Sequence, residues 1–281
     1  MGLAGLPHPI SPEEAAARDP LLALALVRLR RWKGECFALG AATAVVAGPP
    51  KERPETSVVG PPEAAAALLR YLAATGRLRP GDWLTVPDGV LSLSEVRSQL
   101  TFKDLWDPWV WMYHDAATMP PIEPVDVPGM NWTINWRPDA RDLDEINQLL
   151  DGAYPGASFR PGDKGVWRWC GARTHYDNYL VAVGALLRLV PGGVPRLASV
   201  ATRPRYRGQG IGSGLVTRMA LAAEAFGNVA KRPVVSLSAY QAETRVVALY
   251  ERLGFRLVHH LETVEVAGPL TQFSGSVGNA L

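Results

Sequence analysis

A glycine-rich turn between a strand pattern and a helix pattern is the feature of this sequence that most constrains its fold. The turn reads Arg203-Pro-Arg-Tyr-Arg-Gly-Gln-Gly-Ile-Gly-Ser213. Glycine has no Cβ, so its backbone adopts unusual dihedral angles and a ligand can approach the main chain closely. The N–H groups at the start of the following helix favour an anion such as a pyrophosphate. The sequence therefore predicts a strand, turn and helix that together bind a phosphate-bearing ligand.

The local charge around this turn also favours an anion. The whole chain carries a net charge of only +2, which argues against a basic face for a nucleic acid. Residues 178–223, however, contain no Asp or Glu, and their arginines are Arg188, Arg196, Arg203, Arg205, Arg207 and Arg218. The alternative is a solvated arginine face beside an ordinary tight turn. A Walker loop is disfavoured because no Lys-Ser/Thr pair follows these glycines, and a dinucleotide fingerprint because Leu215 stands where its third glycine is required.

The chain is long enough for two domains or one large one. The proline-rich segment 115–128 cannot continue as a helix or a central strand, so it reads as a linker. We therefore expect an N-terminal α/β lobe at residues 1–127 and a second domain at residues 128–281.

Apolar periodicity and turn residues predict the individual elements. In the first half we expect helix 12–31 with a break at Asp19-Pro20, strand 36–46, helix 62–76, strand 83–86 and helix 92–105. In the second half we expect strand 132–137, helix 138–151, a loop at 152–174, strands 179–190 and 196–202 joined by a hairpin at 191–193, helix 212–226, strand 234–240, helix 243–253 and strand 255–266. This order predicts an α/β (α+β) fold in which helices cover a sheet.

Several classes of protein are not expected from the sequence. Cys36 and Cys170 lie far apart outside any C-x-x-C pair, and the histidines show no H-E-x-x-H spacing, so we expect neither a disulfide framework nor a metal site. No apolar run approaches the ~18–20 residues that span a bilayer. The N-terminus lacks the basic region of a secretory signal. We therefore expect a cytoplasmic protein without membrane or nucleic-acid partners.

Two motifs resemble the GNAT superfamily of acyl-CoA-dependent N-acyltransferases. The family signature Q/R-x-x-G-x-G/A is met by Arg207-Gly-Gln-Gly-Ile-Gly212, and the helix motif A-x-x-L-Y-E-x-L-G-F is similar to Val246–Phe255. The resemblance covers roughly residues 131–267 and implies a mixed, mostly antiparallel sheet flanked by helices. The first half faintly resembles the leading part of the same fold, which implies a degenerate second lobe. A small capping domain that shapes the acceptor site is the alternative.

The resemblance also implies roles for individual residues. Acetyl-CoA, or a related acyl-CoA, is the implied co-substrate, with its pantetheine arm along Val200, Ala201 and Thr202. Its pyrophosphate is expected on the turn residues Arg207, Gly208, Gln209, Gly210, Ile211, Gly212 and Ser213. A backbone N–H of the strand is expected to stabilise the oxyanion. Tyr250 matches the tyrosine that protonates the departing thiolate, and the alternative for it is a buried core aromatic.

The sequence departs from the family pattern at Glu243, where asparagine is common, and at Val246, where a small alanine is usual. No acidic residue lies on residues 196–202, so the sequence assigns no general base. His175, Asp177 and Asp163 are candidates by residue type alone, and Trp167, Trp169 and Tyr176 are candidates for an acceptor pocket or for core packing.

The implied activity is an N-acetyltransferase in which a primary amine of a small molecule or peptide attacks the thioester directly, without Cys170. The alternative is a non-catalytic acyl-CoA-binding regulatory module. The sequence does not identify the acceptor, and both a monomer and a homodimer are compatible with it.

Overall fold

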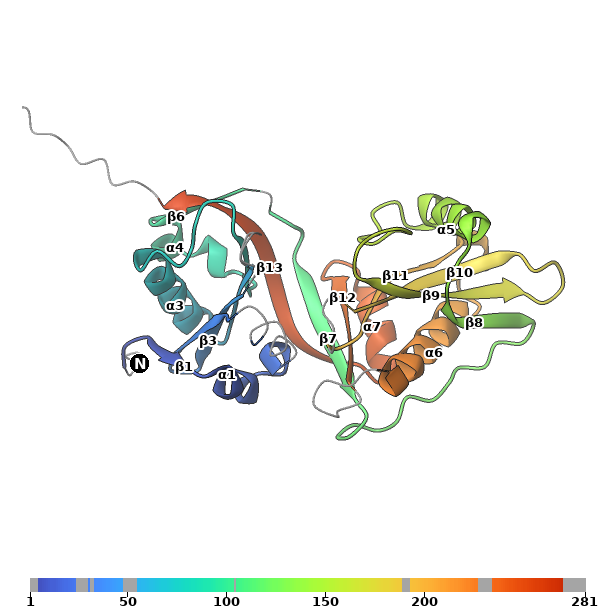
Figure 1. Ribbon diagram of the computed structural model, residues 1–281, viewed down its shortest axis with the longest axis horizontal. Coiled ribbons are helices and arrows are strands. Elements are labelled where there is room, and N and C mark those ends of the chain that lie inside the picture. Colours follow the sequence, from blue (N-terminus) through green and yellow to red (C-terminus); the bar gives the residue numbers. More distant parts are fainter. Residues whose placement is uncertain are drawn as a thin grey trace, which may run out of the picture. The chain divides into compact units, whose positions relative to one another are not determined.

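The computed structural model describes residues 5–23, 30, 33–47, 55–103, 105–188, 193–226 and 234–269. These residues fall into two compact units (Figure 1). The first unit consists of described residues from Met1–Pro108 and Leu261–Leu281, and the second is Trp109–His260.

The first unit is a sheet with the strand order β1-β2-β3-β4-β5-β13, and β6 also pairs with β13. Its strands are β1 His8–Ile10, β2 Glu35–Leu39, β3 Ala42–Ala47, β4 Glu55–Val59, β5 Trp83–Pro87, β6 Leu100–Lys103 and the later part of β13 Arg256–Pro269. Its helices are α1 Pro12–Arg18, α3 Pro62–Ala74, α4 Ser94–Arg97 and the 3-10 turn η1 Val90–Ser92. Leu68, Leu69 and Leu72 bury one face of α3 against the sheet. Burial of each such side chain contributes about 1.5–3 kcal/mol.

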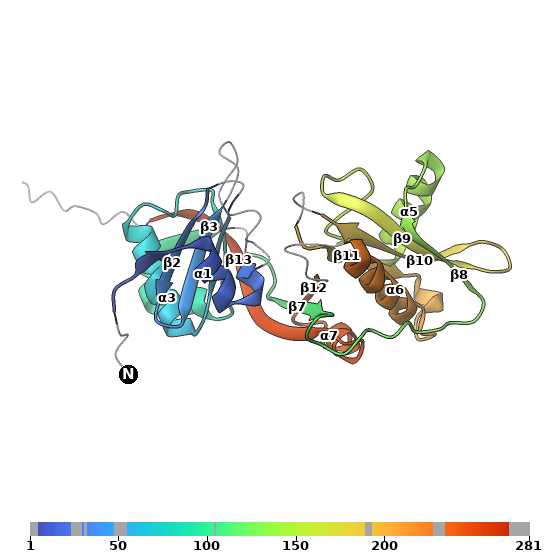
Figure 2. The ribbon, with the colours of Figure 1, turned by 60° about the horizontal axis from the view of Figure 1, so that its bottom comes forward.

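The second unit is a sheet with the order β8-β9-β10-β11-β12-β7-β13. Its strands are β7 Trp109–Asp115, β8 Met130–Trp136, β9 Val166–Thr174, β10 Leu180–Leu187, β11 Arg196–Thr202, β12 Val234–Tyr240 and the first residues of β13. Its helices are α5 Ala140–Ala153, α6 Ile211–Phe226, α7 Thr244–Arg252 and the 3-10 turn η2 Pro204–Tyr206. Helices α5 and α6 cover opposite faces of the sheet (Figures 1 and 2) and bury separate cores.

The two units repeat one topology. In the first, β1 to β4 pair antiparallel in sequence and β4 pairs with β5 in parallel. In the second, β8 to β11 pair antiparallel and β11 pairs with β12 in parallel. A helix, α3 or α6, connects the parallel pair in each.

In each unit, the strand that follows the parallel pair in the sheet comes from the other half of the chain. In the first unit β5 pairs antiparallel with β13, from Leu261↔Pro87 to Glu265↔Trp83. In the second unit β12 pairs antiparallel with β7, from Val234↔Asp115 to Tyr240↔Trp109. Without these strands, β5 and β12 would present open edges. The division expected at residues 127/128 leaves β7 with the first half of the chain, whereas the compact units place β7 in the second.

Most of the expected elements are confirmed. The α/β fold class with a mostly antiparallel sheet flanked by helices holds, and the ranges expected for β11 and β12 agree at both ends. The helices expected at 62–76, 138–151, 212–226 and 243–253 and the strands expected at 83–86, 132–137, 179–190 and 255–266 agree within a few residues. Helix α1 ends at Arg18, at the expected break, and Ser11 caps it by accepting the N–H of Glu14 at 3.0 Å. The hairpin expected at 191–193 and parts of the helix expected at 12–31 lie outside the described residues.

Three expectations were wrong. Residues 36–46 are not one strand but the hairpin β2–β3, because Gly40 has φ +56° and turns the chain between Leu39 and Ala42. Residues 92–105 form only the short helix α4, followed by strand β6. The loop expected at 152–174 contains strand β9, whose small residues Gly171 and Ala172 pair on both sides.

We expect a fragment of residues 128–281 to aggregate, because it lacks β7 and exposes the edge of β12. A fragment of residues 109–260 retains that strand and is expected to be monomeric and folded. Size-exclusion chromatography with circular dichroism checks this. A monomeric, folded 128–281 fragment would show that β7 is dispensable.

Candidate functional site

The glycine-rich turn has the backbone geometry that its sequence predicts. Gly208 and Gly210 have φ of +76° and +80°, in the left-handed region that favours glycine. The N–H of Gly214 donates to the carbonyl of Gly210 at 2.9 Å, which is the first turn of α6. The N–H groups of Ile211, Gly212 and Ser213 precede that bond, so they have no acceptor within the helix. The turn thus presents a row of donors at the positive end of a helix.

Three of the nearby arginines hold the backbone around the turn. Arg207 donates to the carbonyls of Thr202 at 3.1 Å and Ala153 at 2.8 Å, which ties the end of β11 to the end of α5. Arg203 donates to the carbonyl of Leu180 at 2.8 Å. Arg218 donates to the carbonyl of Val125 at 2.5 Å. These arginines act by positioning the turn, which a solvated face would not do.

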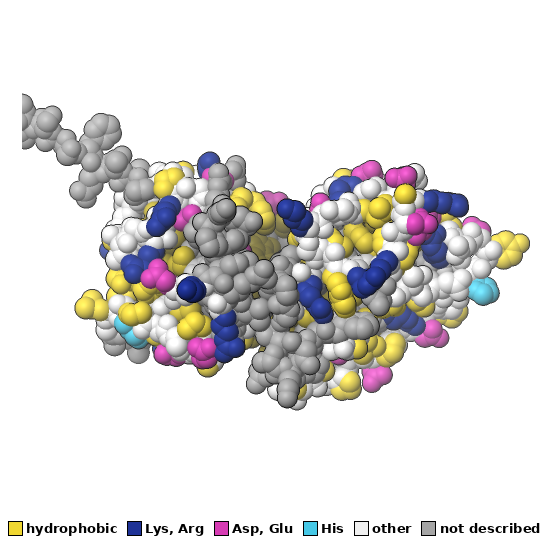
Figure 3. Space-filling model, in the orientation of Figure 1, with side chains coloured by type: hydrophobic (Ala, Val, Ile, Leu, Met, Phe, Trp, Pro, Cys, Tyr) yellow, Lys and Arg dark blue, Asp and Glu magenta, His cyan; other side chains and the backbone are white. Residues whose placement is uncertain are grey.

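The charge on the visible surface is mixed. Basic side chains (dark blue) and acidic ones (magenta) are interspersed on the described surface in Figure 3. Arg205 is exposed beside the turn, with its guanidinium 5.2 Å from the ring centroid of Tyr179. Arg205 therefore adds an exposed positive charge beside the turn.

Strands β11 and β12 part beside the turn. Their parallel pairing consists of Arg196↔Ser236 and Leu197↔Leu237, while β12 stays paired with β7 along its whole length. Residues Ala198 to Thr202 of β11 therefore form no backbone pairing with β12. Thr202 Oγ1 lies 3.5 Å from where a Cβ of Gly212 would stand, so this strand end adjoins the start of α6. The predicted residues Val200, Ala201 and Thr202 lie at this opening.

A bulge in β11 accompanies the opening. Val183 pairs with Ala201 and Ala185 with Ala198, so Ser199 and Val200 oppose Gly184 alone. Ser199 has φ +50°, an uncommon conformation for serine. Its hydroxyl donates to the carbonyl of Phe159 at 2.7 Å and accepts that residue's N–H at 3.1 Å. These two bonds hold the bulge and fix the loop that follows α5.

Tyr250 lies on α7 and is 8% exposed. Burial raises the pKa of its phenol well above the usual value, and the nearby Tyr154 and Glu243 raise it further. The phenol is therefore protonated over the physiological pH range.

The other candidates of the sequence analysis are engaged elsewhere. Asp163 accepts the N–H of Arg160 at 2.7 Å, Asp177 accepts a hydrogen bond from Thr174, and His175 contacts Asn131 at 3.2 Å. Trp169 is buried in the core beneath α5, Trp167 lies 4.2 Å from the guanidinium of Arg188, and Tyr176 is fully exposed. The described contacts bring none of them to the opening.

Two tyrosines were not selected from the sequence: Tyr154, which raises the pKa of Tyr250, and Tyr240, which raises the pKa of Tyr154. Tyr154 ends α5, and burial, Tyr240 and Glu243 raise the pKa of its phenol. Tyr240 ends β12. Only their places at element ends could have pointed to them, and that is a weak signal in a single sequence.

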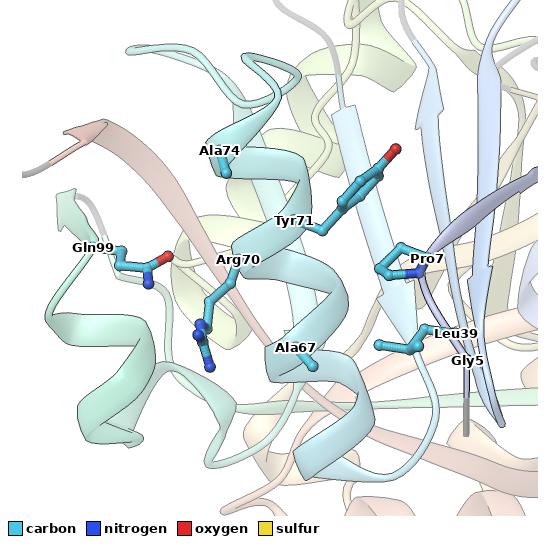
Figure 4. Close-up of a pocket in the computed structure, with 8 residues that line it drawn as sticks. All are labelled: Gly5, Pro7, Leu39, Ala67, Arg70, Tyr71, Ala74 and Gln99. Carbon is cyan, nitrogen blue, oxygen red and sulfur yellow. The ribbon is translucent and has the colours of Figure 1, made fainter. Parts of the chain in front are cut away.

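The first unit lacks an equivalent turn. Only Gly60 and Pro61 separate β4 from α3, and Pro61 and Pro62 have no N–H to offer an anion. This unit has a pocket of about 390 Å³ between α3 and the N-terminal segment, lined by Arg70, Tyr71 and Gln99 among others (Figure 4). The described residues contain no cluster of potential metal ligands, and no helix among them is long and apolar enough to span a membrane.

A strap formed by residues 116–129 runs along α6 toward the turn. Val125 donates its N–H to Thr217 Oγ1 at 3.2 Å, and its carbonyl accepts from Arg218. The strap starts at β7, where the fully buried His114 lies between two acceptors. Its Nδ1 is 2.5 Å from Glu224 Oε1 and its Nε2 is 2.9 Å from the carbonyl of Pro120. Two acceptors favour an imidazolium that donates to both.

Burial lowers the pKa of His114, but the Glu224 carboxylate and the Pro120 carbonyl outweigh it, so the pKa of His114 is raised overall. The ion pair therefore stabilises the fold fully below the unfolded value of about 6.5, and this contribution is lost as the pH rises through the folded value. We expect Glu224→Gln to cost about 1–3 kcal/mol at pH 6 and less at pH 9. Urea unfolding at both pH values measures this, and an equal cost at both would contradict the ion pair.

Comparisons with known proteins agree with this geometry. Residues 174–257 match the family model described as an acetyltransferase (GNAT) domain. A Drosophila protein of solved structure is 12% identical, with 93% of this chain and 98% of that chain covered and a TM-score of 0.56. A GCN5-related N-acetyltransferase from Sphaerobacter thermophilus is 17% identical, with 94% and 96% covered and a TM-score of 0.51. At these identities the two structures show a similarity of fold alone. No curated protein matches the sequence.

Proposed function

We propose, from the GNAT acetyltransferase domain at residues 174–257, that the chain is an acyltransferase that moves an acetyl group from acetyl-CoA to a primary amine. One observation carries the proposal. The N-terminus of α6, which offers several N–H donors, adjoins an unpaired edge of β11 where Gly212 meets Thr202. A ligand with a pyrophosphate and an amide-bearing arm fits both parts, because the first needs N–H donors and the second can pair with a strand.

The residues of the site bind and orient the donor. The N–H groups of Ile211, Gly212 and Ser213 hold the pyrophosphate, in the turn shaped by Gly208 and Gly210. The free edge of Val200, Ala201 and Thr202 pairs with the pantetheine arm. Arg207 and Gln209 complete the turn, where Arg207 ties it to α5 and Gln209 contacts the carbonyl of Arg205 at 3.3 Å.

Acetyl-CoA supplies an activated acyl thioester. A backbone N–H of β11 at the opening stabilises negative charge on the carbonyl oxygen, where low local polarity strengthens the interaction. The neutral acceptor amine attacks the carbonyl carbon, and Tyr250 donates its proton to the sulfur as the C–S bond breaks. The amine nitrogen loses one N–H proton as the amide forms, and this proton restores the Tyr250 phenol through solvent. A phenol with a raised pKa is a weak acid, so the proton moves only as negative charge develops on sulfur.

Gly210→Asp is expected to reduce acetyl-CoA affinity at least 100-fold, because it strains a left-handed backbone and adds negative charge at the anion site. Isothermal titration calorimetry measures the change. Gly76→Asp is the matched control, since Gly76 has φ +71° and open space around it in the first unit. Equal affinity of the Gly210 variant and wild type would contradict the turn assignment.

Tyr250→Phe is expected to lower kcat by about 10²–10⁴-fold and to leave acetyl-CoA affinity within a few-fold, because only the proton donor is lost. Thiol release from acetyl-CoA across an amine panel, with calorimetry for donor binding, measures both. Unchanged turnover would remove Tyr250 from this role. Donor binding by the wild type without thiol release for any amine would favour the non-catalytic acyl-CoA-binding module.

A further inference from the structure

The strap reaches both ends of helix α6. Where it leaves β7, the buried imidazole of His114 contacts Glu224, near the C-terminal end of the helix, and the carbonyl of Pro120 in the strap. At the other end of the strap, Val127 Cγ2 lies 3.7 Å from where a Cβ of Gly210 would stand, in the glycine-rich turn. The strap therefore connects a buried charged group with the turn at the start of α6.

Contacts between these two ends fix the strap along its length. Ile122 is buried and lies 3.4 Å from where a Cβ of Gly254 would stand, just after the end of α7. Val125 donates its N–H to Thr217 Oγ1 at 3.2 Å, and its carbonyl accepts from Arg218 at 2.5 Å. Consecutive contacts are two or three residues apart, so no part of the strap between its ends is left without support.

The composition of the strap makes it stiff. It contains four prolines, which are Pro120, Pro121, Pro124 and Pro128. Proline fixes its own φ and holds the preceding residue in an extended conformation. Polyproline chain rises about 3.1 Å per residue, so the seven steps from Pro120 to Val127 span about 22 Å. The helical rise from Gly210 to Glu224 is about 21 Å. The strap therefore matches the helix in length, with little spare chain to absorb a displacement at either end.

The contacts of His114 depend on the charge of its imidazole. Both ring nitrogens face acceptors, and a neutral imidazole donates to only one of them. Burial opposes the proton, whereas Glu224 on α6 and the adjacent Asp115 on β7 favour it. Val235 of β12 and Phe255 before β13, which also face His114, are neutral. Loss of the proton therefore removes the bond to the helix or the bond to the strap.

We propose that His114 is a positioning residue for the donor, because its ion pair with Glu224 fastens the strap and the strap supports the turn that binds the pyrophosphate of CoA. This inference rests on the proposed binding of acetyl-CoA at the turn. When His114 is neutral, the Pro120 end of the strap is released and Val127 supports the turn less well. The pKa of His114 is raised, so donor affinity is full below about pH 6.5 and decreases as the pH rises through the folded value.

Calorimetry with CoA and the full chain, at pH 6 and pH 9, tests the ion pair. Each variant is compared with wild type at the same pH, so the ionisation of CoA itself cancels. We expect Glu224→Gln to weaken CoA binding about 5- to 20-fold at pH 6 and less at pH 9. Glu123→Gln, the same change at an exposed residue of the strap, is the control and should not alter the affinity. An equal effect of Glu224→Gln at both pH values, or none at pH 6, would overturn the inference.

Val127→Ala tests the transmission along the strap and leaves the ion pair intact, so it serves even if Glu224→Gln does not fold at pH 6. We expect Val127→Ala to weaken CoA binding more at pH 6 than at pH 9. Glu224→Gln should weaken binding less when added to Val127→Ala than when added to wild type, because both act through one strap. Independent effects of the two changes, or no effect of Val127→Ala, would overturn the inference. No CoA binding by wild type at either pH would overturn the donor site itself and the inference with it.

Discussion

The parting of β11 from β12 is the constraint on which the candidate site depends. Two strands that pair in parallel at Arg196 and Leu197 and then separate leave one edge of β11 with backbone groups that a ligand can use. The separation is built into β11 itself, because its bulge adds a residue opposite Gly184 and increases the local twist. The Ser199 hydroxyl holds the bulge by two bonds to Phe159. The same contact that opens the sheet thus orders the loop beyond α5.

The second constraint is the exchange of strands between the chain halves. Helix α6 and the turn rest on a sheet in which β12 depends on β7, a strand that precedes the proline-rich strap. The strap is then packed along α6 through Val125 and ends beside the turn, where Val127 lies 3.7 Å from the position of a Cβ on Gly210. A segment that looks like a linker in the sequence is therefore part of the support of the site. This also explains why a boundary at residues 127/128 and the compact units differ.

Local patterns in the sequence were sufficient for the elements that carry the site. Strand β11, helix α6 and strand β12 are each bounded by glycine, proline or charged residues, so their ranges could be predicted closely. The hairpin at Gly40 was missed because its single glycine interrupts an otherwise continuous apolar run. The pairing of β7 with β12 and the contact of His114 with Glu224, 110 residues apart, have no local signature. The left-handed conformation of Ser199 has none either, since serine seldom adopts it.

The environment of Tyr250 decides how this residue can act in the proposed reaction. Burial raises the pKa of its phenol, and Tyr154 and the Glu243 charge raise it further, so the phenol is a weaker acid than a free tyrosine. A weak acid does not protonate the sulfur of an intact thioester. Its proton moves only as the C–S bond breaks and negative charge develops on sulfur, so proton transfer and departure of the thiolate form one step of the proposed mechanism.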